Sequence, residues 1–147
     1  MPVKFEKKCI QVSPSNVINL QHRTLKSCGL SYQKINYLKS LSYAFLNKSL
    51  KPKSWNKLSD EEIISQLTEI KGIGRWTAEM YLIFNLCRPD VFPANDIGVI
   101  RGICKCYNLK YPITHHHAIT LSKKWKPWRS VATWYLWRSL DPIPVKY

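Results

Sequence analysis

The stretch Ile70-Lys71-Gly72-Ile73-Gly74-Arg75-Trp76-Thr77-Ala78 decides the fold of this 147-residue chain. Two glycines that flank one apolar residue, between two amphipathic segments, predict a tight hairpin between helices, with a positive φ at either glycine. The N–H groups of Gly72, Gly74 and the residues beyond them would point outward at the start of the second helix, where a phosphate can bind. Lys71 and Arg75 would add positive charge. The alternative is an ordinary glycine-capped helix end.

The rest of the chain also has a helical pattern, and strand-like alternation is absent. Ser59-Asp60-Glu61-Glu62 predicts a capping box, followed by the apolar positions Ile63, Ile64, Leu67 and Ile70. We expect a helix over residues 75–87 that buries Trp76, Met80, Ile83 and Phe84. The other expected helices cover residues 14–28, 31–46, 96–107, 114–125 and the segment from Pro127 onward. In the helix over 31–46, Phe45 and Leu46 are expected on the apolar stripe. Residues 52–56 are expected to form a linker. The sequence therefore predicts an all-α fold with one compact domain over residues 1–147.

Composition narrows the class of partner. Hydrophobic residues make up 45% of the chain and charged residues 22%, which is typical of a globular protein. The net charge of +14 favours a polyanion, and nucleic acid more than an anionic membrane, because no helix shows a clean basic-amphipathic pattern. No apolar run is long enough to span a bilayer, and the start lacks the apolar core of a signal peptide. Five scattered cysteines indicate reduced thiols in the cytosol.

Asp96, in Pro93-Ala94-Asn95-Asp96, is the candidate catalytic group. An aspartate at the start of a helix is commonly an N-cap, and this is the simpler interpretation. The functional interpretation is an ionised carboxylate beside an aromatic pocket. Such a group suits cleavage of an N-glycosidic bond, because positive charge develops on the sugar.

Aromatic and histidine residues gather toward the carboxyl end. The chain has six tryptophans, of which Trp125, Trp128, Trp134 and Trp137 are close together in sequence. Core packing is the simpler role for any one of them, but together they could form a pocket for a flipped, cationic base. The run His115-His116-His117 is interpreted as a polar helix start, because no acid or cysteine lies at metal-ligand spacing.

Four segments carry a resemblance to a known family. They are Cys28-Gly29-Leu30-Ser31-Tyr32-Gln33-Lys34, residues 70–79, Asp90-Val91-Phe92-Pro93-Ala94-Asn95-Asp96, and residues 127–141. In order and spacing these resemble the helix-hairpin-helix DNA glycosylase superfamily, and within it the 3-methyladenine DNA glycosylase II branch. The resemblance covers most of the chain, from Cys28 to Asp141.

The resemblance implies a role for each matching position. Asp96 matches the family's essential aspartate, and Gly72, Gly74 and Thr77 match positions whose backbone holds a DNA phosphate. The main-chain carbonyls of Thr68, Ile70 and Ile73 match those that hold a monovalent cation. Trp76 and Trp137 match aromatic walls of the base pocket, and Met80 lies where some relatives have tyrosine.

Trp76 bears on the type of reaction that the resemblance implies. Relatives that cut the DNA backbone have a lysine there, which forms a Schiff base that tryptophan cannot form. The four-cysteine motif that binds an iron–sulfur cluster in some relatives is also missing. The implied activity is hydrolytic release of alkylated purines from double-stranded DNA as the first step of base excision repair, without lyase activity. The implied protein is a monomer in the cytoplasm with the nucleoid, or in a nucleus.

One departure from the family leaves alternatives open. Relatives have more chain before Cys28, including a helix that supplies the wedge for the gap left by a flipped base, so the chain is expected to be shortened at its N-terminus. The first hypothesis is an active glycosylase. The alternatives are a non-catalytic DNA-binding module and a fragment that depends on a partner chain.

Overall fold

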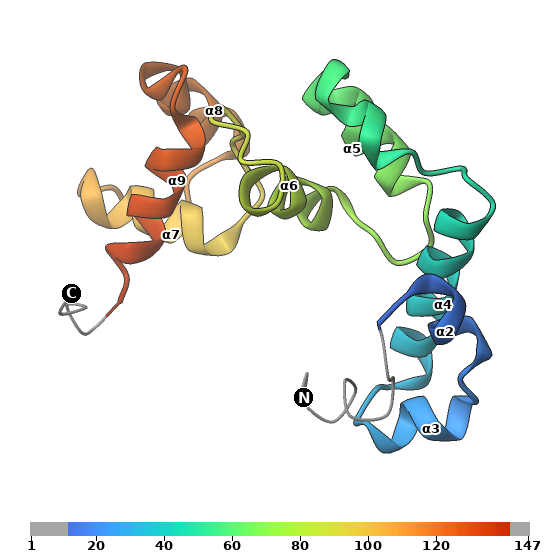
Figure 1. Cartoon of the computed structure of the whole chain (residues 1–147). Helices are drawn as coiled ribbons and strands as arrows, with labels where there is room; N and C mark the ends of the chain where they lie inside the picture. Colours follow the sequence, from blue (N-terminus) through green and yellow to red (C-terminus); the bar gives the residue numbers. More distant parts are fainter. Residues whose placement is uncertain (1–11, 142–147) are drawn as a thin grey trace, which may run out of the picture. The chain divides into compact units, whose positions relative to one another are not determined.

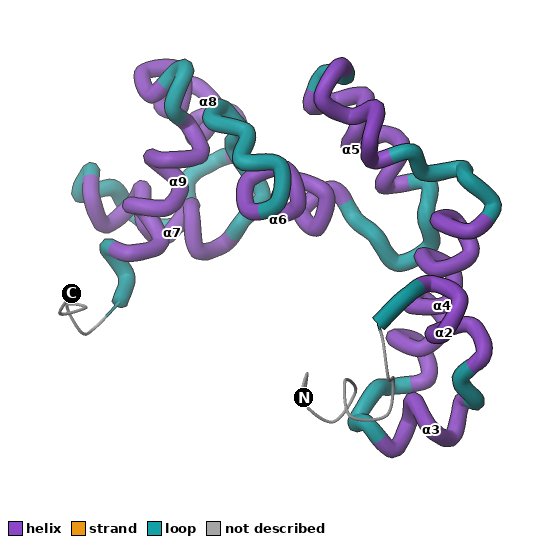
Figure 2. Tube along the Cα trace, in the orientation of Figure 1, coloured by secondary structure: helices purple, strands orange, loops and turns teal. Residues whose placement is uncertain are grey.

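The computed structural model describes residues 12–141, which form helices joined by loops and turns, with no strand among them (Figures 1 and 2). The all-α prediction is confirmed. The contacts group the chain into two compact units, one ending at Arg75 and the other beginning at Trp76. Each unit is described by itself, and the single domain over 1–147 stays a prediction.

In its described part, residues 12–75, the first unit contains α2 (Pro14–Asn19), α3 (His22–Ser27), α4 (Tyr32–Leu46), the 3-10 helix η1 (Pro52–Lys57) and α5 (Asp60–Thr68). Both α2 and α3 pack on α4. The prediction of one helix over 14–28 was wrong, because Leu20 takes an extended conformation and ends α2. The expected linker at 52–56 is helical, and its Trp55 is buried with the indole N–H donating to Gln66 Oε1 at 2.9 Å.

Serine side chains cap the starts of α2, α4 and α5 in the first unit. The predicted capping box is confirmed, since Ser59 Oγ accepts from the Glu62 N–H and Glu62 Oε2 accepts from the Ser59 N–H at 2.7 Å. The apolar face predicted for α5 is also buried. Phe45 and Leu46, in contrast, are exposed, because the last turn of α4 buries Ala44 instead.

The second unit contains α6 (Arg75–Phe84, which begins one residue before the boundary), α7 (Ile97–Cys106), α8 (His115–Ser122), the 3-10 helix η2 (Lys123–Trp125) and α9 (Arg129–Arg138). Its core is built from Val99, Ile100, Ile103, Cys104, Ala118 and Leu136. Helices α7 and α9 pack closely because Gly102 has no side chain: a Cβ there would lie 2.6 Å from the Leu136 carbonyl oxygen. The last helix begins later than predicted, because Trp128 is non-helical and forms its N-cap.

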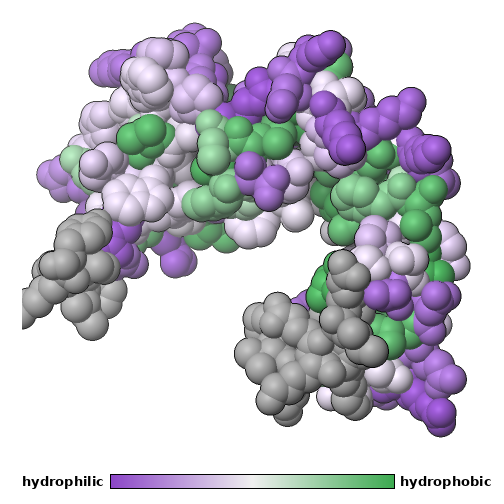
Figure 3. Space-filling model, viewed as in Figure 1, coloured by the Kyte–Doolittle hydropathy of each residue, from purple (hydrophilic) through white to green (hydrophobic). Residues whose placement is uncertain are grey.

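Helix α6 buries a different face from the one predicted. Ala78, Glu79 and Leu82 are buried, whereas Trp76 is 52% exposed and Phe84 is 61% exposed. Apolar and aromatic residues lie on both the buried and the exposed side of this helix, so periodicity could not separate the core face from the exposed face. The space-filling view shows hydrophobic residues exposed among hydrophilic ones (Figure 3). The prediction that Trp76 and Phe84 belong to the core was wrong, and this leaves their rings available for another role.

Within residues 12–141, no helix combines the length and apolar character that crossing a bilayer requires.

Candidate active site around Asp96 and the hairpin

The hairpin turn lies between α5 and α6, and its two glycines differ. Gly72 has φ 96°, and a Cβ on it would lie 2.1 Å from Cγ of the Tyr37 ring. Gly74 has no positive φ, and a Cβ there would meet no atom within 4 Å. Between them, Ile73 is half-buried and donates its N–H to the Ile70 carbonyl at 3.0 Å. The turn therefore requires glycine at 72 and merely tolerates it at 74.

The two basic residues of the hairpin have different surroundings. Arg75 forms a bidentate ion pair with Glu61, with N–O distances of 2.5 and 2.9 Å. Hydrogen bonding from Arg75 holds the pKa of the Glu61 carboxyl below its ordinary value. Lys71 is exposed beside the turn, as is Thr77 in the first turn of α6. Part of the positive charge expected at this turn is thus already compensated by Glu61.

The three carbonyls expected to hold a cation belong to the last residue of α5 and to the turn that follows it. Thr68 is the last residue of α5, so its carbonyl is one of the last carbonyls of the helix, which accept no N–H from a later helical residue. The Ile70 carbonyl accepts the Ile73 N–H but keeps a second lone pair. Neutral carbonyl oxygens suit an alkali-metal ion, so the donor set fits such a cation. No group of three or more His, Cys, Asp or Glu residues suited to a metal occurs within 12–141.

Asp96 lies at the start of α7 and accepts three N–H groups. As the N-cap of α7, its Oδ1 accepts from the Val99 N–H at 2.7 Å, so the capping interpretation is confirmed. The same carboxylate also accepts the indole N–H of Trp137 on Oδ1 at 3.0 Å and that of Trp76 on Oδ2 at 2.6 Å. The cap and the candidate catalytic group are therefore one and the same carboxylate.

Aromatic side chains from α6 and α9 surround this carboxylate. Trp76, Met80 and Phe84 follow each other at four-residue intervals and share one face of α6. The Phe84 ring stacks on Trp137 with centroids 5.9 Å apart and an interplanar angle of 17°. The structure thus brings Trp76, Trp137 and Asp96 together as expected. Phe84 was missed as a site residue, although its spacing from Trp76 and Met80 could have revealed it.

Gly98 is a second residue that the sequence reasoning missed. A Cβ at this position would lie 3.0 Å from Asp96 Oδ1, 3.0 Å from Trp137 Cδ1 and 3.2 Å from Trp137 Nε1. These distances are tighter than ordinary van der Waals contact, so a side chain here would press between the indole and the carboxylate. Together with Gly102, which lies one turn further along α7, Gly98 lets α9 bring Trp137 to Asp96.

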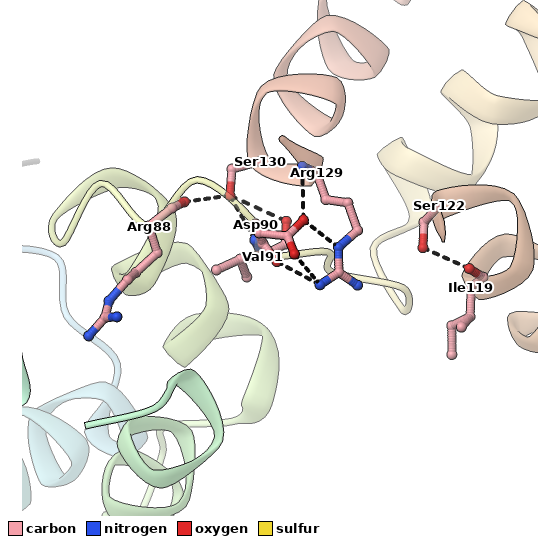
Figure 4. A network of polar contacts seen from close by, with 7 residues as sticks. All are labelled: Arg88, Asp90, Val91, Ile119, Ser122, Arg129 and Ser130. Atoms are coloured by element: carbon pink, nitrogen blue, oxygen red, sulfur yellow. Dashed lines mark hydrogen bonds and ion pairs between the residues drawn. The ribbon is translucent and has the colours of Figure 1, made fainter. Parts of the chain in front are cut away.

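An ion-paired network joins the loop before Asp96 to the start of α9 (Figure 4). The Arg129 guanidinium donates to both carboxylate oxygens of Asp90, at 2.7 and 2.9 Å, and to the Asp90 carbonyl at 2.9 Å. Ser130 Oγ accepts from the Val91 N–H and donates to the Arg88 carbonyl at 2.6 Å. Hydrogen bonds from Arg129 lower the pKa of Asp90 below its ordinary value of 3.8. Asp96 and Trp137 thus lie on segments that this network holds together.

The other candidates of the carboxyl-terminal region lie elsewhere. Trp125 packs edge-on to Phe92 and donates to the Tyr107 hydroxyl at 3.2 Å, and Trp134 packs edge-on to Tyr135. Trp128 is 60% exposed. The three histidines form the exposed first turn of α8, as expected for a polar helix start. Of the four tryptophans in this region, only Trp137 hydrogen-bonds Asp96 in the described part of the chain.

Comparison with known proteins identifies the family of the chain. Residues 1–128 match the family described as "HhH-GPD superfamily base excision DNA repair protein". The chain belongs to this superfamily. A curated relative, DNA-3-methyladenine glycosylase 1 of Schizosaccharomyces pombe, is 38% identical over 128 residues, which are 86% of this chain and 56% of the relative. A second relative, the alkylbase DNA glycosidase-like protein mag2 of the same yeast, is 36% identical over 86% of this chain and 60% of its own length.

Solved structures match as well. The S. pombe 3-methyladenine DNA glycosylase in complex with abasic DNA gives a TM-score of 0.82 at 37% identity, over 91% of this chain and 66% of that one. The DNA-3-methyladenine glycosidase of Bacillus halodurans gives a TM-score of 0.86 at 29% identity, over 96% of this chain and 66% of that one. The chain thus spans 56% and 60% of the lengths of the two curated yeast relatives.

Proposed function

We propose that this HhH-GPD protein is a DNA repair glycosylase that hydrolyses the N-glycosidic bond of alkylated purines of the 3-methyladenine type. The observation that carries the proposal is the Asp96 carboxylate, which three N–H groups hold beside the exposed ring of Trp76 and the stacked pair Phe84–Trp137. Carboxylates stabilise the oxocarbenium-like sugar that forms when a glycosidic bond breaks. The names of the relatives support the same class of substrate.

The proposed reaction needs only one carboxylate. In a purine alkylated on a ring nitrogen, the base carries a positive charge, so it leaves with the electron pair of the C1′–N bond and becomes neutral. The positive charge that remains on the sugar is stabilised by Asp96. Water then attacks C1′ and loses its proton to the carboxylate or to solvent, and an abasic site remains. Trp76, Met80 and Trp137, together with Phe84, would stack on the flipped base.

The hairpin would hold the DNA backbone. The N–H groups of Gly72, Gly74 and Thr77 would bind a phosphate, with Lys71 as the exposed cation beside them. A monovalent cation on the carbonyls of Thr68, Ile70 and Ile73 would neutralise the end of α5. These contacts are independent of base sequence, so they would position the duplex without selecting the lesion.

The proposal also covers strand cleavage, partners and location. Trp76 lies where a Schiff-base lysine would be needed, so we infer hydrolysis without lyase activity. The partner is double-stranded DNA with alkylated bases, bound by a monomer that needs no iron–sulfur cluster. The protein would act wherever the DNA is, in the cytoplasm with the nucleoid or in a nucleus.

Product analysis tests the proposal. The chain is incubated with a methylated duplex, the free base is identified by mass spectrometry, and the strand is analysed with and without alkali. The proposal predicts free methyladenine and strand breaks only after alkali. Strand cleavage without alkali would contradict the absence of lyase activity. Salt-sensitive DNA binding without any base release would instead indicate a non-catalytic binding module.

A further inference from the structure

The carboxylate of Asp96 receives more hydrogen bonds than its capping role needs. An N-cap requires one N–H from the first turn, and Val99 supplies it at 2.7 Å. The two indole N–H groups come from α6 and α9, so three different helices converge on one carboxylate. Exposed indoles could satisfy their N–H groups with water, and Trp76 is 52% exposed.

We propose that Trp76 and Trp137 act on the reaction as hydrogen-bond donors that fix the orientation of the Asp96 carboxylate, in addition to any stacking on the base. This inference rests on the proposed function. Hydrogen bonds to an ionised carboxylate are stronger than neutral ones. With both oxygens engaged, Asp96 cannot rotate about its terminal torsion without breaking at least two of them.

The distribution of donors also assigns the reacting oxygen. Each carboxylate oxygen has two lone pairs. Among the donors of residues 12–141, Oδ1 accepts both the Val99 N–H and the Trp137 indole N–H, whereas Oδ2 accepts the Trp76 indole N–H alone. Oδ2 is therefore the oxygen that keeps a lone pair for the sugar, and Trp76 sets the direction in which that lone pair points.

The surroundings of Trp137 are built to keep its indole in this orientation. Phe84 stacks on one face of the ring, and the missing side chain of Gly98 leaves the space through which the N–H reaches Oδ1. Through these contacts Gly98 and Phe84 position Trp137, and Phe84 does so in addition to any stacking on the base.

The hydrogen bonds themselves can be observed by NMR of indole ¹⁵N–¹H groups, which needs no substrate. Resonances of Trp76 and Trp137 are assigned by replacing each with Phe. In Asp96→Asn, the proposal predicts upfield shifts of these two resonances, because the acceptor loses its charge. Trp55, which donates to Gln66, is the internal control and should not move. If neither the Trp76 nor the Trp137 resonance moved, the proposed contacts would be refuted.

Kinetics test whether the donors matter for the reaction. Each tryptophan is replaced in turn by 3-benzothienylalanine, which keeps the shape and stacking surface but has sulfur in place of the N–H. We expect the single-turnover rate of base release to fall about 10- to 100-fold at either position, with little change in DNA affinity. The same replacement at Trp134, on the same helix as Trp137, should leave the rate unchanged.

The outcomes separate this inference from the proposed function. If the wild-type chain releases base and both analogues release it equally fast, the donor role is wrong and the glycosylase proposal stands. If DNA affinity falls instead of the rate, the indoles act only as walls, and the inference is again wrong. If the wild-type chain releases no base, the proposed function itself fails and the inference falls with it.

Discussion

The two hairpin glycines should respond in opposite ways to the same substitution. At Gly72, alanine would have to adopt φ 96°, and its Cβ would lie 2.1 Å from the Tyr37 ring. A strained backbone conformation and an overpacked contact each cost about 1–3 kcal/mol, so Gly72→Ala should lower the free energy of unfolding by about 2–6 kcal/mol. At Gly74 there is neither strain nor a neighbour, so Gly74→Ala should stay within about 0.5 kcal/mol of the wild type.

Urea unfolding followed by circular dichroism measures both variants. Hydrogen exchange of residues 60–75 shows whether the loss is located at the hairpin. A double-mutant cycle with Tyr37→Ala separates the two causes, because removal of the ring relieves the overpacking but leaves the backbone strain. The expected coupling between positions 37 and 72 is about 1–3 kcal/mol.

Two results would refute this reasoning. One is equal stability of Gly72→Ala and Gly74→Ala, which would mean that the turn does not depend on the conformation of Gly72. The other is a cycle without coupling, which would show that Tyr37 does not pack against the turn.

Three further predictions concern the rest of the chain. Because Arg129 lowers the pKa of Asp90 below 3.8, the stability that this pair contributes is complete above about pH 4 and is lost as the pH falls through the lowered value. Thermal melts at a series of pH values should show a Tm that falls below about pH 4 in the wild type and falls less in Asp90→Asn. Equal slopes of Tm against pH in the two proteins would contradict this prediction. Gly98→Ala should slow base release about tenfold at unchanged DNA affinity, measured under single-turnover conditions, and an unchanged rate would show that the indole does not need this space. Ser59→Ala should lower the free energy of unfolding by about 1 kcal/mol in urea titrations, whereas the control Ser65→Ala, at an exposed position of the same helix, should not destabilise the protein.

Features that depend on neighbours in sequence could be predicted. The capping box at Ser59 and the N-cap at Asp96 are built from residues three apart, so their geometry follows from local spacing. The glycine hairpin belongs to the same class. Its dependence on Tyr37, however, comes from a helix far earlier in the chain, and no local pattern indicates it.

Features that depend on packing could not be predicted. Periodicity places the residues of α6 on faces, but it does not tell whether an apolar face is covered by the core or presented to a ligand, and so Trp76 and Phe84 were misplaced. The pairing of Arg75 with Glu61 connects residues 14 positions apart in the first unit, and it changes the charge that the hairpin offers to DNA. The convergence of indole N–H groups on Asp96 likewise requires helices that are distant in sequence.

The rate of base release from a duplex with one alkylated purine, measured with enzyme in excess for the wild type and Asp96→Asn, tests the central claim most directly. Asn keeps a cap oxygen for the Val99 N–H but carries no charge, so the fold and the DNA affinity should be retained. We expect release by the wild type and a loss of at least about 100-fold in the variant, on the scale typical of removing a group that stabilises charge in a transition state. Equal rates for the two proteins would contradict the assignment of Asp96, whatever the DNA affinity.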